Sequence, residues 1–84
     1  MKNITKSEII NFLRDQVSKE CEVPFPEVDV NKEFLEFRMD SLKAVYIMDR
    51  LEKFIGIELS PLYFWDHPTI DSLAGFIATE IVGT

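Results

Sequence analysis

Apolar residues recur at steps of three and four in three stretches of the chain, which is the pattern of helices with one buried face. The first stretch follows Thr5 and Glu8, whose capping-box spacing predicts a helix start. Pro24 and Pro26 end this helix, because proline lacks a backbone N–H and disfavours the helical conformation in the residue before it. Its apolar positions are Ile9, Ile10, Leu13, Val17 and Cys21.

The second stretch predicts a helix over residues 41–55 that Gly56 closes, since glycine readily adopts the positive φ common after a helix C-terminus. The apolar stripe expected to face the core is Leu42, Val45, Met48, Leu51 and Ile55. The residues expected to point mostly outward are Lys43, Tyr46, Asp49, Arg50 and Lys53.

A short helical turn and a last helix are predicted beyond Gly56. Ser60 and Pro61 resemble a helix cap followed by proline in the first helical position, opening a turn that runs through Trp65. The segment 66–68 breaks that turn, and Thr69 then caps a last helix that ends near Gly83. The apolar face of the last helix is Leu73, Phe76, Ile77 and Ile81.

The connection between the first two long helices runs to about residue 39 and is acidic. Apolar residues interrupt it, so we expect it to be held against the core: Val28, Val30, Phe34, Leu35 and Phe37. No segment alternates like a β-strand over a convincing length. The prediction is therefore a single all-α domain over residues 1–84: a small four-helix bundle of three long helices and a short third helix, with a long first loop. We expect a freestanding chain that begins at Met1.

Composition narrows the class of protein. Hydrophobic residues make up 46% of the 84 residues, no apolar run is long enough to cross a bilayer, and the N-terminus lacks the apolar region of a signal peptide. The single cysteine excludes an internal disulfide and a multi-cysteine zinc site. The net charge of −6 argues against nucleic-acid and anionic-membrane partners and favours proteins with basic patches. We expect a cytoplasmic monomer.

The tripeptide Asp-Ser-Leu occurs twice, at residues 40–42 and 71–73. Ser41 begins the second helix with Asp40 as its cap, and Leu42 is expected to anchor the backbone beneath it. Unpaired N–H groups and the helix dipole favour a negative group at that end, such as a phosphodiester. Ser72 instead lies within the first turn after the Thr69 cap, where its hydroxyl can bond to the Thr69 carbonyl. We therefore predict that Ser41, and not Ser72, carries a group.

A set of motifs around Ser41 resembles acyl carrier proteins of the polyketide-synthase type, within the phosphopantetheine-binding carrier family. The resemblance covers about residues 34–81. It rests on Phe37-Arg38-Met39-Asp40-Ser41-Leu42-Lys43-Ala44-Val45, Leu51-Glu52, Gly56-Ile57 and Asp66-His67-Pro68-Thr69-Ile70.

The resemblance implies a four-helix carrier bundle that catalyses nothing itself. Ser41 would be esterified by 4′-phosphopantetheine, delivered from coenzyme A by a separate phosphopantetheinyl transferase. The thiol of that arm would hold an acyl group as a thioester and present it to acyl-loading, ketosynthase-like or other acyl-processing enzymes, in a polyketide or related fatty-acyl pathway.

Two features depart from the family's usual pattern. Arg38 stands where glycine is usual, so it either impedes the modifying enzyme or contacts the phosphate of the arm. The second helix is close to neutral, whereas fatty-acid carriers tend to have an acidic one. We therefore predict a dedicated carrier that works poorly in a generic fatty-acid system. Its predicted docking residues are Lys43, Tyr46, Ile47 and Arg50, with Arg38, Asp40 and Leu42 beside the attachment site.

Other interpretations stay open. An aminoacyl or peptidyl carrier would have the same fold and arm, although Met39-Asp40 favours acyl cargo. An unmodified helical interaction protein is a further alternative, and an enzyme is the weakest, because a lone His67 in a helix break offers no nucleophile–base pair. No metal site is expected, since Asp40 is explained as a cap. Cys21, Trp65 and most phenylalanines are expected to be core residues.

Overall fold

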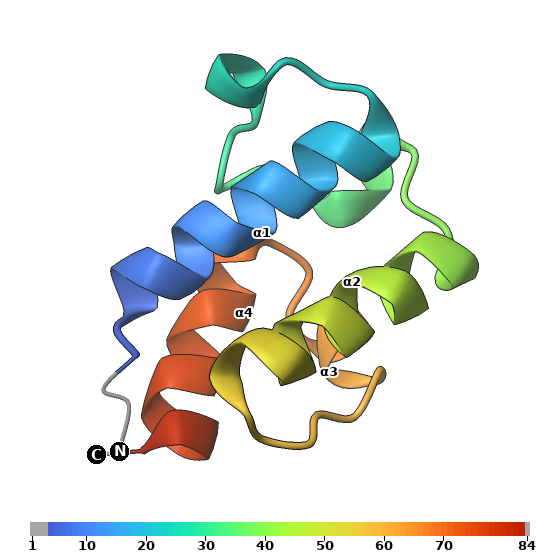
Figure 1. The fold of residues 1–84 in the computed structure, drawn as a ribbon. Coiled ribbons are helices and arrows are strands. Elements are labelled where there is room, and N and C mark those ends of the chain that lie inside the picture. Colours follow the sequence, from blue (N-terminus) through green and yellow to red (C-terminus); the bar gives the residue numbers. More distant parts are fainter. Residues whose placement is uncertain (1–3, 84) are drawn as a thin grey trace.

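The computed structural model describes residues 4–83, which form a helical bundle (Figure 1). The helices are α1 (Lys6–Cys21), α2 (Ser41–Ile55), α3 (Tyr63–Asp66), α4 (Ile70–Phe76) and η3 (Ile77–Val82), the last a π-helix that continues α4. Within residues 4–83 there is no strand, only an isolated antiparallel bridge between Glu33 and Thr69. The predicted all-α bundle of four helices with a long first loop is confirmed.

The helix ends follow the local chemistry expected of them. At the start of α1, the Glu8 N–H donates to Thr5 Oγ1 at 3.2 Å, and the Thr5 N–H donates to Glu8 Oε1 at 3.0 Å, completing the predicted capping box. Gly56 follows α2 in the left-handed conformation, with φ of 76°. The last helix begins after Thr69 as predicted and ends before Gly83, although its final turns are π and not α.

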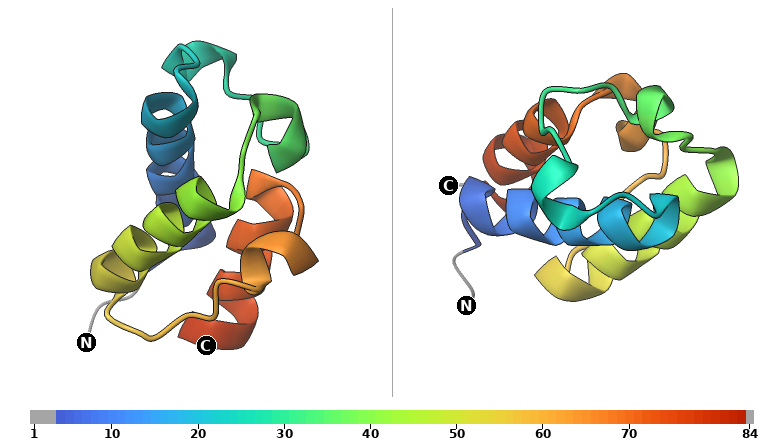
Figure 2. Two further views of the ribbon diagram at one scale, coloured as in Figure 1. Left: turned by 90° about the vertical axis from the view of Figure 1, so that its right-hand side faces the viewer. Right: turned by 90° about the horizontal axis from the view of Figure 1, so that it is seen from above.

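Helix α1 lies across the bundle and packs against both α2 and α4 (Figure 1). Figure 2 shows α3 beside the start of α4, with the connection between α1 and α2 passing over one end of the bundle. Two short 3₁₀ helices interrupt that connection, η1 (Phe25–Glu27) and η2 (Phe34–Phe37). The Phe34 N–H donates to the Pro68 carbonyl at 2.8 Å, and the Asp71 N–H donates to the Val30 carbonyl at 3.0 Å. The connection is thus fastened to the start of α4.

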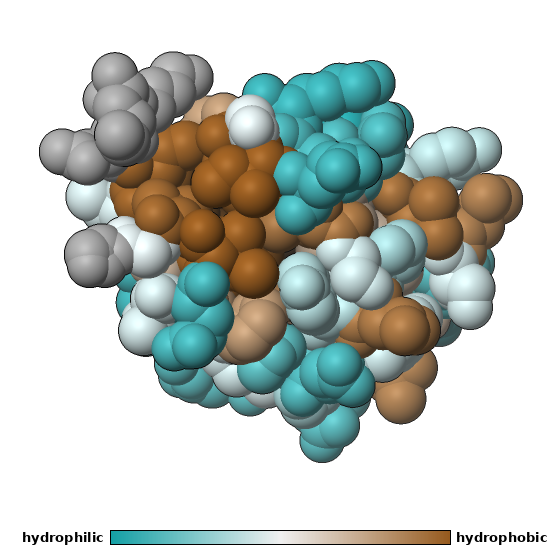
Figure 3. Space-filling model, turned by 90° about the horizontal axis from the view of Figure 1, so that it is seen from below, coloured by the Kyte–Doolittle hydropathy of each residue, from teal (hydrophilic) through white to brown (hydrophobic). Residues whose placement is uncertain are grey.

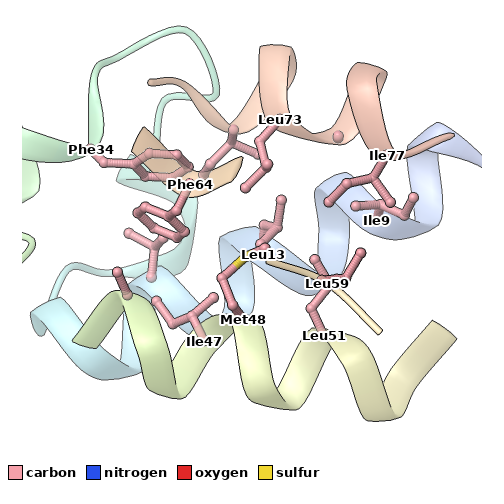
Figure 4. Close-up of a cluster of buried hydrophobic side chains, with 14 of the residues drawn as sticks. Ile9, Leu13, Phe34, Ile47, Met48, Leu51, Leu59, Phe64, Leu73 and Ile77 are labelled. Carbon is pink, nitrogen blue, oxygen red and sulfur yellow. The ribbon is translucent and has the colours of Figure 1, made fainter. Parts of the chain in front are cut away.

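The core contains side chains from all four α-helices and from both long connections (Figure 4). Phe34, from the first connection, stacks on Phe64 of α3 with ring centroids 4.0 Å apart. Leu59 enters the core from the second connection. Because Val28, Phe34 and Phe37 are all buried, the prediction that the first connection is held against the core is confirmed.

The predicted core face of α2 is wrong in its first half. The buried residues of this helix are Ala44, Ile47, Met48, Leu51 and Ile55. Leu42 and Val45, which we expected to face inward, are 62% and 46% exposed. Both faces of the first two turns are apolar, so periodicity alone does not choose between them. The face with Ala44 packs inward, where a small side chain allows the neighbouring backbone to approach closely.

Three further expectations need correction. The short helix α3 begins at Tyr63, two residues after Pro61, and Ser60 Oγ accepts instead from the Leu62 N–H at 3.2 Å within the preceding turn. Trp65 and Phe25 are 40% and 39% exposed. Each has one covered face, since Trp65 meets Phe64 edge-on and Phe25 lies under the Arg14 guanidinium. No helix within residues 4–83 has the length and hydropathy needed to cross a membrane.

Candidate functional site

The segment that leads into α2 presents Ser41 on a fixed support. Phe37 and Met39 are each only 5% exposed, so they anchor this segment in the core. Arg38, Asp40 and Ser41 point outward between and after these anchors, and all three are exposed. The predicted anchor, Leu42, is not buried. The alternation of Phe37 and Met39 therefore does the anchoring that we assigned to the residue after the serine.

Ser41 is the first residue of α2, and Asp40 is its cap as predicted. Asp40 Oδ1 accepts from the Lys43 N–H at 2.8 Å, and the Asp40 carbonyl accepts from the Ala44 N–H at 2.9 Å. The N–H groups of Ser41 and Leu42 precede the first intrahelical acceptor, and no side chain within residues 4–83 takes them up. An anion bound to Ser41 therefore has backbone donors and the positive end of a 15-residue helix beside it.

Arg38 holds a backbone conformation that suits glycine better. Its φ is 62° and its ψ is 36°, in the left-handed region, which costs a residue with a Cβ roughly 1 kcal/mol. Its N–H donates to the Leu35 carbonyl at 3.2 Å and so closes η2. Its carbonyl accepts from Lys43 Nζ at 3.4 Å. The turn that glycine usually occupies in the family is thus preserved here with an arginine in it.

The second Asp-Ser-Leu triplet has a different structure. Ser72 is part-buried, and its Oγ donates to the Thr69 carbonyl at 3.1 Å, as predicted. The Ser72 N–H donates in turn to Thr69 Oγ1 at 3.1 Å, and the Thr69 N–H donates to Ser72 Oγ at 3.2 Å. This hydroxyl is committed to capping α4. No such hydrogen bond holds the Ser41 hydroxyl within residues 4–83.

The predicted docking residues on α2 do not all share one face. Ile47 is fully buried, so its assignment to a docking surface is wrong. Arg50 Nη1 is bound to Glu20 Oε2 at 2.7 Å and to Gln16 Oε1 at 3.0 Å, which ties α2 to α1. Lys43 is half-buried, and Tyr46 is 48% exposed.

Sequence reasoning missed a group of exposed apolar side chains around the start of α2 and near α3. In addition to Tyr46, these are Leu35, Leu42, Val45, Leu62 and Trp65. Figure 3 shows hydrophobic areas separated by polar surface toward the side on which α2 begins in Figure 1. A signal was available in α2, where Leu42, Val45 and Tyr46 form a second apolar stripe beside the one that packs inward.

A pocket lies between the end of α1 and the first connection. Its lining residues are Cys21, Glu22, Val23, Glu27, Lys32, Glu36, Phe37 and Arg38. Cys21, predicted to be a core residue, is only half-buried at its edge. Burial raises the pKa of the Cys21 thiol, while the positive charge of Lys43 acts in the opposite direction. Residues 4–83 contain no cluster of carboxylate, histidine and cysteine side chains that could hold a metal ion.

The comparisons with known proteins agree with this geometry. The family profile described as “Phosphopantetheine attachment site” matches residues 11–77. The chain belongs to this family. Its cofactor is therefore phosphopantetheine, and members of this carrier family hold substrates without catalysing reactions themselves. The predicted carrier function is confirmed, as is the prediction that the chain is not an enzyme.

One polypeptide of the phenolphthiocerol/phthiocerol polyketide synthase of Mycobacterium tuberculosis is 38% identical over 76 residues. Those residues are 90% of this chain but 4% of the synthase polypeptide, so the match concerns one carrier domain within a much longer protein. The chain is accordingly a carrier domain of the kind that polyketide synthases contain, and such domains work with acyl-processing enzymes.

Two solved carrier proteins have the same fold. A free-standing peptidyl carrier protein from a secondary metabolic pathway of Acinetobacter baumannii superposes with a TM-score of 0.85 and 31% identity, covering 92% of this chain and 96% of that one. An acyl carrier protein from Anabaena, described as having a variant phosphopantetheinylation-site sequence, gives a TM-score of 0.79 and 32% identity, covering 93% and 92%. The predicted carrier fold is confirmed.

Proposed function

We propose that Ser41 is the residue to which phosphopantetheine is attached, and that residues 1–84 act as a single acyl carrier domain. The observation that carries this proposal is the exposed Ser41 hydroxyl at the start of α2, free of the hydrogen bonds that occupy Ser72. When bound, the arm supplies a terminal thiol that holds an acyl group as a thioester. The work of the chain is to present Ser41 Oγ on a rigid support.

Each neighbour of Ser41 has a part in that presentation. Asp40 caps α2 and fixes the direction in which the serine side chain leaves the helix. Phe37 and Met39 anchor the preceding segment, which limits its movement when an enzyme approaches. The unpaired N–H groups of Ser41 and Leu42 favour a negative group on Oγ. These features fit a phosphodiester without any change of fold.

We place the docking surface on the exposed apolar stripe that begins beside Ser41. Leu42, Val45 and Tyr46 offer adjacent apolar contact area on α2, with Lys43 and Asp40 at its border. Arg38 lies before this stripe, and Arg50 at its far end contributes through Tyr46, over whose ring its guanidinium lies at 5.9 Å. The partners in this proposal are a phosphopantetheinyl transferase and acyl-loading or ketosynthase-like enzymes, met by a monomeric carrier in the cytoplasm.

A peptidyl carrier is the second candidate, because the Acinetobacter baumannii structure with TM-score 0.85 bears that description. The two candidates differ only in the enzyme that loads the arm. We expect a loading enzyme for acyl groups to charge the protein carrying the arm, and an adenylating enzyme for amino acids to leave it uncharged. Efficient aminoacylation alone would transfer the assignment to the peptidyl class.

Intact mass spectrometry tests the attachment site. The purified chain is incubated with coenzyme A and a broad-specificity phosphopantetheinyl transferase, alongside Ser41→Ala and Ser72→Ala as matched variants of the two triplets. We expect one arm on the wild type and on Ser72→Ala, and none on Ser41→Ala. Loss of the arm in Ser72→Ala alone would refute the choice of Ser41, and no addition to any variant would favour an unmodified interaction protein.

A further inference from the structure

Arg38 differs from every other basic residue that the structure describes. Its guanidinium is the one Lys or Arg side-chain group in residues 4–83 that makes no hydrogen bond, ion pair or ring contact. The others bind carboxylates, carbonyl groups or aromatic rings. In a chain with a net charge of −6, a cation without a partner is unexpected, because acidic side chains are abundant.

The surroundings of Arg38 make this freedom more informative. The pocket beside it is lined by Glu22, Glu27 and Glu36, yet none of these carboxylates lies within ion-pair distance of the guanidinium. Arg38 also holds a left-handed backbone that glycine would adopt without strain. Residues kept in strained conformations cluster at sites of function. An arginine placed there has a cost that neither local packing nor an ion pair offsets.

The position of Arg38 relative to Ser41 suggests what offsets it. The two residues are three positions apart in the chain, so their Cα atoms are separated by at most about 11 Å. Both side chains are exposed on the same short segment, because Phe37 and Met39 are the residues that turn inward. Lys43 lies on the other side of Ser41, with its Nζ held at 3.4 Å from the Arg38 carbonyl. Two cations therefore flank the serine in the sequence.

We propose that Arg38 is a positioning residue for the prosthetic group: its guanidinium binds the phosphodiester on Ser41, with Lys43 as a second, weaker cation. This inference rests on the proposed attachment at Ser41. A guanidinium suits the task because its planar array of donors matches two phosphate oxygens at once. The contact restrains the base of the arm and balances the negative charge that attachment adds beside Asp40.

The direct test follows arginine side chains by NMR before and after modification. Arg14, Arg38 and Arg50 are the three arginines of the chain, so the Nε–Hε signals of Arg14 and Arg50 serve as internal controls. After intact mass has confirmed the arm on Ser41, we expect the Arg38 signal alone to shift and to exchange more slowly with water. An Arg38 signal that is the same with and without the arm would overturn the proposal.

Thermal unfolding of variants gives a second readout. Arg38→Gln removes the charge and keeps the backbone strain, Arg38→Lys keeps the charge, and Lys53→Gln removes a cation from the far end of α2 as a matched control. We expect Arg38→Gln to lower the difference in Tm between the modified and unmodified protein by roughly 2–6 °C at low salt, and Lys53→Gln to leave it unchanged. Arg38→Lys should retain part of the difference.

The outcomes separate the two proposals. Absence of the arm from the wild-type protein, or its presence on Ser41→Ala, refutes the attachment site itself. An arm on Ser41 with an unshifted Arg38 signal and an equal difference in Tm for Arg38→Gln refutes only the phosphate contact. Faster attachment in Arg38→Gly combined with those two results would show that Arg38 hinders the transferase instead.

Discussion

The two Asp-Ser-Leu triplets are identical in sequence, and each lies at the start of a helix, yet every corresponding residue has a different environment. Asp40 caps α2, whereas Asp71 lies inside α4 and pairs with Lys6 at 3.1 Å. Ser41 is exposed, whereas Ser72 bonds to Thr69. Leu42 is 62% exposed, whereas Leu73 is fully buried. The position of each triplet relative to its helix cap produces these differences.

The offset between the triplets acts through helix geometry. In the first triplet the aspartate is the cap itself, whereas in the second the cap is Thr69, two residues before the aspartate. Each residue turns the helix by about 100°, so the corresponding side chains leave their helices in different directions. One triplet therefore directs its serine and leucine to the surface, while the other directs its leucine to the core. A short motif has a defined function only together with its position in the helix.

The largest predicted contrast concerns the two leucines. We expect Leu73→Ala to lower the free energy of unfolding by about 2–5 kcal/mol, because it removes a fully buried side chain and leaves a cavity. Leu42→Ala should change it by less than about 0.5 kcal/mol. Urea unfolding followed by circular dichroism measures both. Equal losses in the two variants would contradict the assigned faces of α2 and α4.

The effect of Leu42→Ala on function should be the reverse of its effect on stability. If Leu42 belongs to the docking surface, its truncation should lower the kcat/KM of arm attachment roughly tenfold, because interface contacts of apolar side chains contribute on the order of 1 kcal/mol or more. Leu73→Ala should leave kcat/KM unchanged at a temperature where it is still folded. Steady-state kinetics with the transferase makes the measurement, with circular dichroism as the check of folding.

The aspartates and serines should differ by smaller amounts. We expect Asp40→Ala to cost about 1 kcal/mol of stability, because the Lys43 N–H loses its acceptor at the start of α2. Asp71→Ala removes an exposed ion pair with Lys6 and should cost at most about 0.5 kcal/mol. Ser72→Ala should cost about 1 kcal/mol and Ser41→Ala almost nothing, since only Ser72 takes part in a cap. Urea midpoints for the four variants would reveal any reversal of this order.

The smallest predicted effect has the opposite sign. Arg38→Gly should raise the free energy of unfolding of the unmodified protein by up to about 1 kcal/mol, since glycine adopts a φ of 62° without a Cβ penalty. The gain is limited because glycine also increases the entropy of the unfolded chain. Differential scanning calorimetry of the unmodified protein is the measurement. A clear loss of stability would mean that the Arg38 side chain makes native contacts of its own.

Much of the fold was predictable because it depends on neighbours in the sequence. The capping box at Thr5, the left-handed Gly56 and the cap at Thr69 involve residues at most four apart, and all are present. The choice of Ser41 over Ser72 depended on the same local chemistry. The burial of the first connection was also predictable, because five apolar residues in an otherwise acidic segment favour contact with a core.

The errors lie where burial depends on distant parts of the chain. Ile47 and Leu42 were assigned to the wrong faces, because α2 has two apolar stripes and periodicity does not say which one meets the rest of the core. Trp65 was expected in the core, but only one face of its ring is covered, by Phe64. Arg50 looked like a surface cation, yet its bonds to Gln16 and Glu20 reach across to another helix.

The sequence by itself therefore determined the helices, their ends and the serine placed at the start of α2, because these follow from hydrogen bonds and side-chain spacing within a few residues. Only the tertiary structure decided which stripe of α2 faces partners and which cation near Ser41 is without a bond. Burial and ion pairing join residues far apart in the chain, so they depend on how the helices pack. The free guanidinium of Arg38 is visible only after every other basic side chain in residues 4–83 has found its neighbour.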